Sequence, residues 1–301
     1  MARPRIALAL GSGSARGWAH VGVIEALCEA GFAPDIICGT SMGALVGAAH
    51  AAGRLEALRR WAGGAGWREI VGLLDVRLAG GGLIEGGSIV AFLRGLGIDG
   101  RIEDLSLPYA AVATDLASGR EEWLQSGPVL DAVRASIALP GIISPARLGD
   151  RWLIDGGLTN PVPVSLCRAL GADRIIAVNL NGDLLGRRFA AAPAGPGPAA
   201  DLLGRLLHNV PKPLRDQSVA IALRLLPQGP SAPGYFDVLA NAVNIMQDRI
   251  TRARLAGEPP HVMLAPRLRD LGLMEFNRAA EAIAEGRACV AEALPAIRRL
   301  V

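Results

Sequence analysis

Three short segments of the sequence carry groups that could perform acyl-transfer chemistry. They are a glycine-rich loop at residues 11–17, a G-x-S-x-G pattern at residues 39–43 and an Asp-Gly-Gly turn at residues 155–157. The loop offers backbone N–H groups for a developing negative charge, the second pattern a serine nucleophile, and the turn a carboxylate that could accept a proton. Whether they act together depends on the elements that position them.

Ser41 lies at the centre of the G-x-S-x-G pattern. The other members of the pattern are Gly39, Thr40, Met42 and Gly43. The apolar run at 35–38 predicts a strand that enters the pattern and a helix begins near residue 42, which is the strand-turn-helix setting of a nucleophile elbow. We therefore expect the Ser41 hydroxyl at the carboxyl edge of a sheet. Taken alone, the motif also fits an ordinary strand-to-helix turn.

The glycine-rich loop follows the first predicted strand and opens a helix, so its amides would point into the same crevice. Its members are Gly11, Ser12, Gly13, Ser14, Ala15, Arg16 and Gly17. A dinucleotide site would need an acidic residue after the second strand, but Asp35 stands at the start of that strand. An oxyanion hole needs backbone N–H groups beside a nucleophile at the next strand end, and that order is present here.

Asp155 is the candidate proton acceptor for the serine. It ends the apolar run 151–154 and is followed by Gly156 and Gly157, which predicts its carboxylate at the same edge. A carboxylate is a weak base at its reference pKa of about 3.9, so this role requires burial. Trp152 and the turn at 158–163 are expected to exclude water. An isolated Asp-Gly-Gly is also compatible with a surface turn.

The four histidines offer a second candidate base. His20 and His50 are predicted to face the core or a helix surface. His208 or His261 could instead complete a triad in the chain order Ser, Asp, His, as in α/β-hydrolases. A non-catalytic module that binds lipid or protein on the same scaffold is the third interpretation of these segments.

The conjunction of the three segments resembles the patatin-like phospholipase family, in its bacterial branch related to neuropathy target esterase. The resemblance extends over residues 5–180 and includes 113–116, 134–141, Pro145 and 160–163. It implies a three-layer α/β fold with a mostly parallel central sheet, helices on both faces and a helical C-terminal part. It also implies a Ser41–Asp155 dyad without histidine, an oxyanion loop containing Gly13, Ser14 and Arg16, and hydrolysis of lipid acyl esters without a cofactor.

The family often has consecutive glycines where this chain has Ser12 and Ser14. If either serine must adopt a positive φ, the conformation costs roughly 1–2 kcal/mol. The sequence therefore leaves open which amides would form the oxyanion hole.

Composition limits the remaining classes. The chain has 301 residues, 51% of them apolar, and a net charge of +3 with both signs scattered along it. This distribution gives no basic stripe for nucleic-acid phosphates, so we expect no nucleic-acid partner. The four cysteines show neither metal-ligand nor disulfide spacing, and the apolar run at 6–10 is too short for a signal peptide. We expect no metal and a cytoplasmic protein that could contact the inner membrane face peripherally; its oligomeric state stays open.

Alternating patterns predict the elements that position the three segments. Strands are expected at 5–10, 34–38, 108–114, 121–124, 147–154, 174–180 and 261–265, and helices at 17–30, 42–52, 237–256 and 275–300. The charge-free run 36–53 is interpreted as a strand, a turn and a helix rather than a membrane span. We expect a catalytic core at 1–180, a flexible insert or lid at 181–236 and a helical part at 237–301.

Two amphipathic stretches are candidates for an interfacial lid over a lipid substrate. They are Trp67–Leu78 and Asp201–Val210. Each combines leucines with arginines at helical spacing, as a helix in a headgroup layer does. Ordinary packed helices are the alternative.

Overall fold

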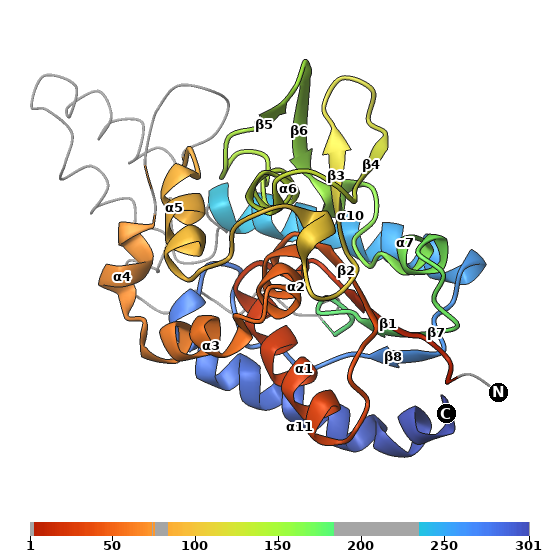
Figure 1. Ribbon diagram of the computed structural model, residues 1–301. Coiled ribbons are helices and arrows are strands. Elements are labelled where there is room, and N and C mark those ends of the chain that lie inside the picture. The colour runs from red at the N-terminus through yellow and green to blue at the C-terminus, as the bar shows by residue number, and fades with distance from the viewer. Residues whose placement is uncertain (1–2, 74, 76–83, 184–234, 301) are drawn as a thin grey trace, which may run out of the picture. The chain divides into compact units, whose positions relative to one another are not determined.

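A computed structural model describes residues 3–73, 75, 84–183 and 235–300. Within these ranges the strands form one eight-stranded sheet in the order β5-β6-β3-β2-β1-β7-β8, with β4 paired to β3 (Figure 1). The strands are β1 Ile6–Leu10, β2 Ile36–Thr40, β3 Tyr109–Asp115, β4 Glu121–Leu124, β5 Ala146–Leu148, β6 Arg151–Asp155, β7 Arg174–Val178 and β8 Val262–Leu264. The pairs β1–β2, β1–β7, β2–β3 and β7–β8 are parallel. The predicted mostly parallel sheet is thus confirmed.

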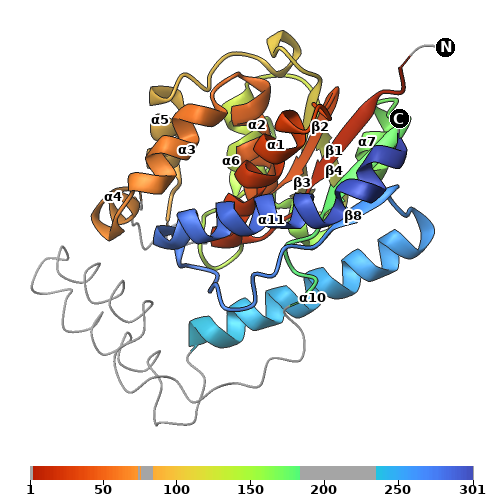
Figure 2. The same cartoon turned by 90° about the horizontal axis from the view of Figure 1, so that it is seen from below.

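Helices cover both faces of this sheet. They are α1 Ala19–Glu29, α2 Met42–Ala51, α3 Leu55–Gly64, α4 Trp67–Gly72, α5 Gly87–Gly95, α6 Val129–Ser136, α7 Val164–Ala169, α10 Tyr235–Gly257 and α11 Ala279–Ile297. Short 3-10 turns occur at Ser14–Trp18, Ile102–Asp104, Gly156–Leu158, Phe276–Arg278 and Arg298–Leu300. Helices α1 and α11 lie side by side on one face (Figures 1 and 2). Helix α7 packs on the other face.

Alternation along β1 explains the two layers of core. Leu8 and Leu10 belong to the apolar cluster under α1 and α2, while Ala7 and Ala9 belong to the cluster under α7. Successive strand residues point to opposite faces, so a strand that is apolar throughout must be covered twice.

The chain divides into two compact units, Met1–Asp183 with Gln247–Val301, and Leu184–Met246. Of the second unit the structure describes only 235–246, the first half of α10. The expected division at 180 and 236 stays a prediction. Helix α4 occupies the start of the stretch Trp67–Leu78; parts of that stretch and all of Asp201–Val210 lie outside the described residues.

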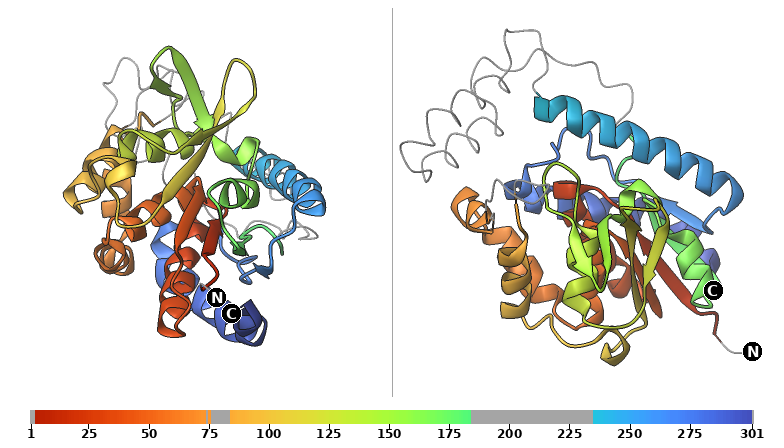
Figure 3. Two further views of the ribbon diagram at one scale, coloured as in Figure 1. Left: turned by 45° about the vertical axis from the view of Figure 1, so that its right-hand side comes forward. Right: turned by 90° about the horizontal axis from the view of Figure 1, so that it is seen from above.

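The expected single strand at 147–154 is wrong, because the chain turns at Gly149 and forms two antiparallel strands, β5 and β6. Leu148 pairs with Arg151, which leaves Gly149 and Asp150 as a two-residue loop, and Gly149 has φ +61°. Glycine at the first loop position is typical of a tight hairpin. This hairpin and the turn between β3 and β4 project from the same end of the sheet (Figures 1 and 3).

Strands β2 and β6 meet end to end along one edge of β3. Val112 pairs with Thr40 of β2, the next residue Ala113 pairs with Asp155 of β6, and β4 occupies the other edge opposite both. Since β2 and β6 run in opposite directions, their last residues face each other. Ser41 follows β2 directly, so this register brings Ser41 beside Asp155.

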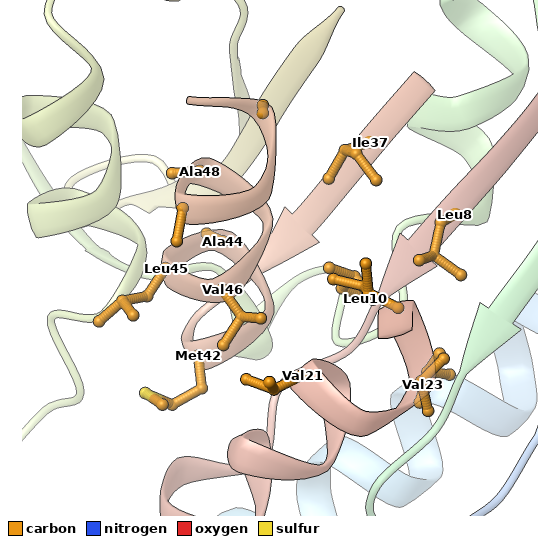
Figure 4. Packing of buried hydrophobic residues seen from close by; sticks show 14 of the residues in the cluster. Leu8, Leu10, Val21, Val23, Ile37, Met42, Ala44, Leu45, Val46 and Ala48 are labelled. Carbon is orange, nitrogen blue, oxygen red and sulfur yellow. The ribbon is translucent and has the colours of Figure 1, made fainter. Parts of the chain in front are cut away.

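The elbow rests on a packed core. Leu8 and Leu10 of β1 and Ile37 of β2 gather with Val21 of α1 and Val46 of α2 in one buried cluster (Figure 4). The charge-free run 36–53 holds β2, the turn and α2, which confirms its interpretation as strand, turn and helix. A fully buried strand and a mostly buried helix on either side fix the position of the turn, because close-packed interiors deform little.

Candidate active site

Ser41 sits on a strained turn between β2 and α2. Its φ of +57° and ψ of −123° lie outside the regions that L-residues favour. Its backbone N–H donates to Ser136 Oγ at 2.8 Å, and Ser136 Oγ donates to the Val112 carbonyl at 2.6 Å. Ser136, the last residue of α6, therefore holds the elbow to β3. Ser136 lies within the resembling segment 134–141, but nothing in its spacing from Ser41 indicates this contact.

Close backbone approaches explain the glycines around the serine. A Cβ at Gly43 would lie 2.1 Å from the Leu10 carbonyl oxygen, and one at Gly17 would lie 2.3 Å from Met42 Cβ. Only glycine fits at such separations. The glycine-rich loop is thereby packed directly against the residue that follows the serine. Gly39 is similarly constrained, since a Cβ added at this position would collide with the backbone of Gly43.

Ser41 and Asp155 form a buried hydrogen-bonded pair. Ser41 Oγ donates to Asp155 Oδ2 at 2.6 Å, and the Gly157 amide donates to Oδ1 at 2.7 Å. Asp155 is 1% exposed. Burial raises the pKa of Asp155 to about 6, although the hydrogen bonds from Ser41 and Gly157 lower it. The carboxylate is thus a stronger base than usual and is still mostly ionised at neutral pH.

The expected shielding of Asp155 by Trp152 is wrong. Trp152 is 50% exposed. It lies three positions before Asp155 on β6, and side chains that alternate along a strand place the two on opposite faces. The base is buried among the ends of β2, β3 and β6 instead, where Gly156 approaches the Val112 carbonyl so closely that a Cβ would lie 2.2 Å from it.

Backbone hydrogen bonds hold the glycine-rich loop through four of its amides. The amides of Gly11, Ser12, Ala15 and Arg16 donate to the carbonyls of Val178, Pro161, Leu273 and Gly13. Among the described residues no backbone acceptor is recorded for the amides of Gly13 and Ser14. Arg16 is buried, and its Nε donates to the Gly13 carbonyl at 3.3 Å.

Ser14 adopts a positive φ of +49° and Ser12 does not. The strain expected from a serine in place of glycine therefore falls on Ser14. Its hydroxyl donates to the Leu273 carbonyl at 2.6 Å, a contact that glycine could not make. This bond, typically worth about 1 kcal/mol, offsets much of the conformational cost.

The histidines do not reach the serine in the described part of the chain. His261 Nδ1 accepts from the Ile175 amide at 3.1 Å, just before β8 and at the amino edge of the parallel strands, so the triad alternative with His261 is wrong. His208 lies outside the described residues. His20 is fully buried and bonds the Gly11 carbonyl at 2.7 Å through Nε2. Burial lowers its pKa to about 4, so it supports the loop as a neutral ring.

A polar cluster that sequence reasoning missed joins three chain segments beside the pair. Gln247 Oε1 accepts from Ser12 Oγ at 2.8 Å and from Asn181 Nδ2 at 2.9 Å, and all three residues are buried. The Gln247 amide nitrogen also lies against Gly157. One glutamine on α10 thus connects the glycine-rich loop, the chain after β7 and the Asp-Gly-Gly turn.

Replacing Gln247 with leucine should lower the free energy of unfolding by about 2 kcal/mol. The substitution leaves the Ser12 hydroxyl and the Asn181 amide buried without their acceptor, which is costly in a dry interior. Thr251→Val is the matched control, because Thr251 is buried on the same helix and its hydroxyl has no partner among the described residues. Urea unfolding of both variants measures the difference. Equal losses in the two variants would contradict the role given to Gln247.

The sequence matches the model of a known protein family. A family model described as patatin-like phospholipase matches residues 8–168, more than half of the chain. The chain belongs to the patatin-like phospholipase family. Family membership supports a lipid hydrolase. The matched range includes the glycine-rich loop, the elbow and the Asp-Gly-Gly turn.

Individual relatives differ in how much of each chain they share. An uncharacterized NTE family protein of Mycobacterium tuberculosis is 37% identical over 335 residues, which cover 97% of this chain and 92% of that protein. Patatin-like phospholipase domain-containing protein 6 of Homo sapiens is 34% identical over 182 residues, 58% of this chain and 13% of that protein. VipD from Legionella pneumophila, a solved structure, aligns with a TM-score of 0.45 and 13% identity over 98% of this chain and 67% of its own.

No helix within the described ranges is both long enough and apolar enough to cross a bilayer.

Proposed function

We propose that this protein is a serine acyl hydrolase that cleaves acyl esters of lipids with a Ser41–Asp155 dyad. The observation that carries the proposal is the 2.6 Å hydrogen bond from the Ser41 hydroxyl to a buried carboxylate whose pKa is raised to about 6. A nucleophile on a strained elbow, in direct contact with a base of suitable pKa, is what ester cleavage through an acyl-enzyme requires.

The reaction proceeds in two halves. Asp155 takes the proton of the Ser41 hydroxyl as Oγ attacks the ester carbonyl carbon, and a tetrahedral intermediate forms. The intermediate collapses, the bond to the alcohol oxygen breaks, and Asp155 returns the proton to that alcohol. A water molecule then attacks the acyl-enzyme with Asp155 again accepting a proton, and the fatty acid leaves while Ser41 regains its hydrogen.

The proposed oxyanion hole lies in the glycine-rich loop. Gly13 and Ser14 carry N–H groups without a recorded backbone acceptor among the described residues. Met42, the residue after the nucleophile, adds its backbone amide, which is the first of α2. Donors fixed by the packing of Gly17 on Met42 would meet the developing negative charge without reorganisation.

The substrate class is a lipid acyl ester of the phospholipase A, lysophospholipase or esterase type, taken from a membrane surface that the protein contacts peripherally. We propose a cytoplasmic location, which the four free thiols support. No cofactor enters the proposed mechanism, since the dyad and the amides supply nucleophile, base and charge stabilisation.

Hydrolytic activity should rise with pH through a single step near pH 6. Asp155 must be ionised to accept the serine proton, and its pKa is raised to about 6 by burial. The value of kcat/KM therefore falls about tenfold for each pH unit below that point and levels off above it. Initial rates on a soluble short-chain ester measure this profile. A profile that is flat between about pH 4.5 and 7.5 would exclude Asp155 as the base.

The experiment that tests the proposal combines active-site labelling with a lipid panel. A fluorophosphonate probe should label Ser41 in the folded protein, and mass spectrometry of the labelled peptide identifies the site. Hydrolysis of phospholipid, lysophospholipid and neutral ester is then measured in parallel. His261→Ala is the control and should retain both labelling and activity, because His261 lies at the opposite edge of the sheet.

Labelling at another residue, or no labelling and no hydrolysis of any lipid, would overturn the proposal. The second result would favour a non-catalytic binding module on the same scaffold. Loss of activity in His261→Ala would instead favour a triad.

A further inference from the structure

Exposed apolar side chains gather at the two hairpins that project from the sheet. In the unit formed by Met1–Asp183 and Gln247–Val301, four large apolar side chains are exposed among the described residues. Three of them are Leu116, the residue after β3, at 51% exposed, Trp152 of β6 at 50% and Trp123 of β4 at 39%. The fourth is Met263 of β8, at 36%. Scattered apolar residues are ordinary on protein surfaces, whereas a cluster calls for a partner.

Strand register places two of these side chains in one row with an arginine. Arg147 pairs with Trp152 across the β5–β6 hairpin. The Leu116 amide donates to the Trp152 carbonyl at 2.8 Å, which extends the β3–β6 ladder by one residue. Directly opposite residues of neighbouring strands point to the same face. We call Arg147, Trp152 and Leu116 the hairpin row.

The hairpin row combines apolar side chains with a positively charged one. The Arg147 guanidinium lies 5.9 Å from the centre of the Trp152 ring. A half-exposed tryptophan with an arginine beside it is suited to the boundary between lipid headgroups and acyl chains, where the ring is partly apolar and the guanidinium can pair with phosphate. The nearest carboxylate to Arg147 is that of Asp150, at 3.9 Å, and it is fully exposed. Arg147 is thus only weakly neutralised within the protein.

A cavity beside the row carries both signs of charge. It has a volume of about 320 Å³, and Arg147 and Trp152 form part of its wall. Arg134 and Ser144 contribute to the rest, together with the acidic residues Glu85 and Asp131. Arg134 donates to the carbonyls of Glu85 and Ser144, so it is fixed in place. A cavity lined by arginines and carboxylates complements a zwitterionic headgroup better than a single anion.

We propose that the hairpin row docks the protein on the headgroup layer of a phospholipid bilayer. The inference rests on the proposed function, which requires a lipid surface as the source of substrate. Trp152 lies on the same strand as Asp155, three residues away, or about 10 Å at ~3.3 Å per residue. Docking through the row would therefore place the dyad close to the headgroup layer, and the projecting hairpins are the part of the sheet that reaches it (Figures 1 and 3).

Vesicle binding tests the proposal with exposed residues that the fold does not need. Trp152→Ser and Leu116→Ser are combined in one variant, and Met263→Ser is the matched control. Phosphatidylcholine vesicles, with and without phosphatidylglycerol, are sedimented with each protein. We expect roughly tenfold weaker binding for the double variant, because docking would bury the exposed half of an aromatic side chain and the variant loses that contribution. Binding by Met263→Ser should be unchanged. Hydrolysis of vesicle phospholipid should fall in proportion, while kcat/KM on a soluble ester should stay unchanged.

Several outcomes would decide against the hairpin row. Equal vesicle binding by the wild type and the double variant, or no vesicle binding by the wild type, would overturn it. Equal losses on vesicles and on the soluble ester would also overturn it, because that pattern indicates damage to the site. Row-dependent binding by a protein that hydrolyses no ester would leave the docking surface standing and would refute the proposed function alone. Arg147→Gln should weaken binding more to vesicles that contain phosphatidylglycerol than to vesicles of phosphatidylcholine alone. An equal effect on both kinds of vesicle would mean that Arg147 is not part of the docking surface.

Discussion

Ser41→Ala is expected to reduce ester hydrolysis by on the order of 10⁶-fold, and Asp155→Asn by about 10²–10⁴-fold. The alanine variant has no oxygen that can form the acyl-enzyme, so only the amides of the loop remain to stabilise attack by water. The asparagine variant keeps the shape of the site and a hydrogen-bonding group toward Ser41, but it cannot take the serine proton. The difference in size between the two losses separates the nucleophile from the base.

Two conservative substitutions elsewhere provide matched controls. Ser106→Ala removes a hydroxyl that donates to the Ala51 carbonyl, and Asp173→Asn changes a carboxylate that accepts from the Arg5 amide at the amino edge of the sheet. Both should keep the activity of the wild type. Kinetics on a soluble ester and fluorophosphonate labelling are the measurements. Residual activity above about a tenth in either dyad variant would be incompatible with the mechanism.

The same Asp155→Asn substitution is expected to stabilise the fold by about 3 kcal/mol near pH 7. Burial raises the pKa of Asp155 from its ordinary value of 3.8 to about 6, and each pKa unit corresponds to ~1.4 kcal/mol. Between these two values the native state holds a proton that the unfolded chain has released. The contribution of Asp155 to stability is therefore complete below about pH 4 and is lost as the pH rises through about 6. Asparagine carries no charge and avoids that loss.

Urea unfolding at two pH values tests this sign. The asparagine variant should exceed the wild type by about 3 kcal/mol near pH 7, and the difference should shrink to little near pH 4. Asp173→Asn, an exchange that removes a negative charge at an exposed position, should show no such gain. A variant that is less stable than the wild type at neutral pH would mean that the Asp155 hydrogen bonds outweigh the cost of burying its charge.

Local patterns made much of this molecule predictable. The apolar alternation and the glycines that follow it predict most strand positions, with Ser41 directly after β2 and Asp155 as the last residue of β6. The rule that parallel strands end at one edge applies to β2 but not to β6, because β6 runs antiparallel to β3, so the meeting of Ser41 and Asp155 depends on the register of both strands on β3. The hairpin loop at Gly149 was available from the same kind of signal, since a Gly-Asp pair between two short apolar runs is typical of a tight turn.

By itself, then, the sequence determined most of the strand positions and the chemical groups placed on them, because turn formation and alternation depend on neighbours along the chain. Only the tertiary structure decided that β2 and β6 share one edge of β3, that Gln247 of α10 holds the loop through Ser12, and that Trp152 faces outward rather than covering Asp155. These contacts join residues that are far apart in the chain. Their selection depends on how all the packed layers fit together, and no local spacing contains that information.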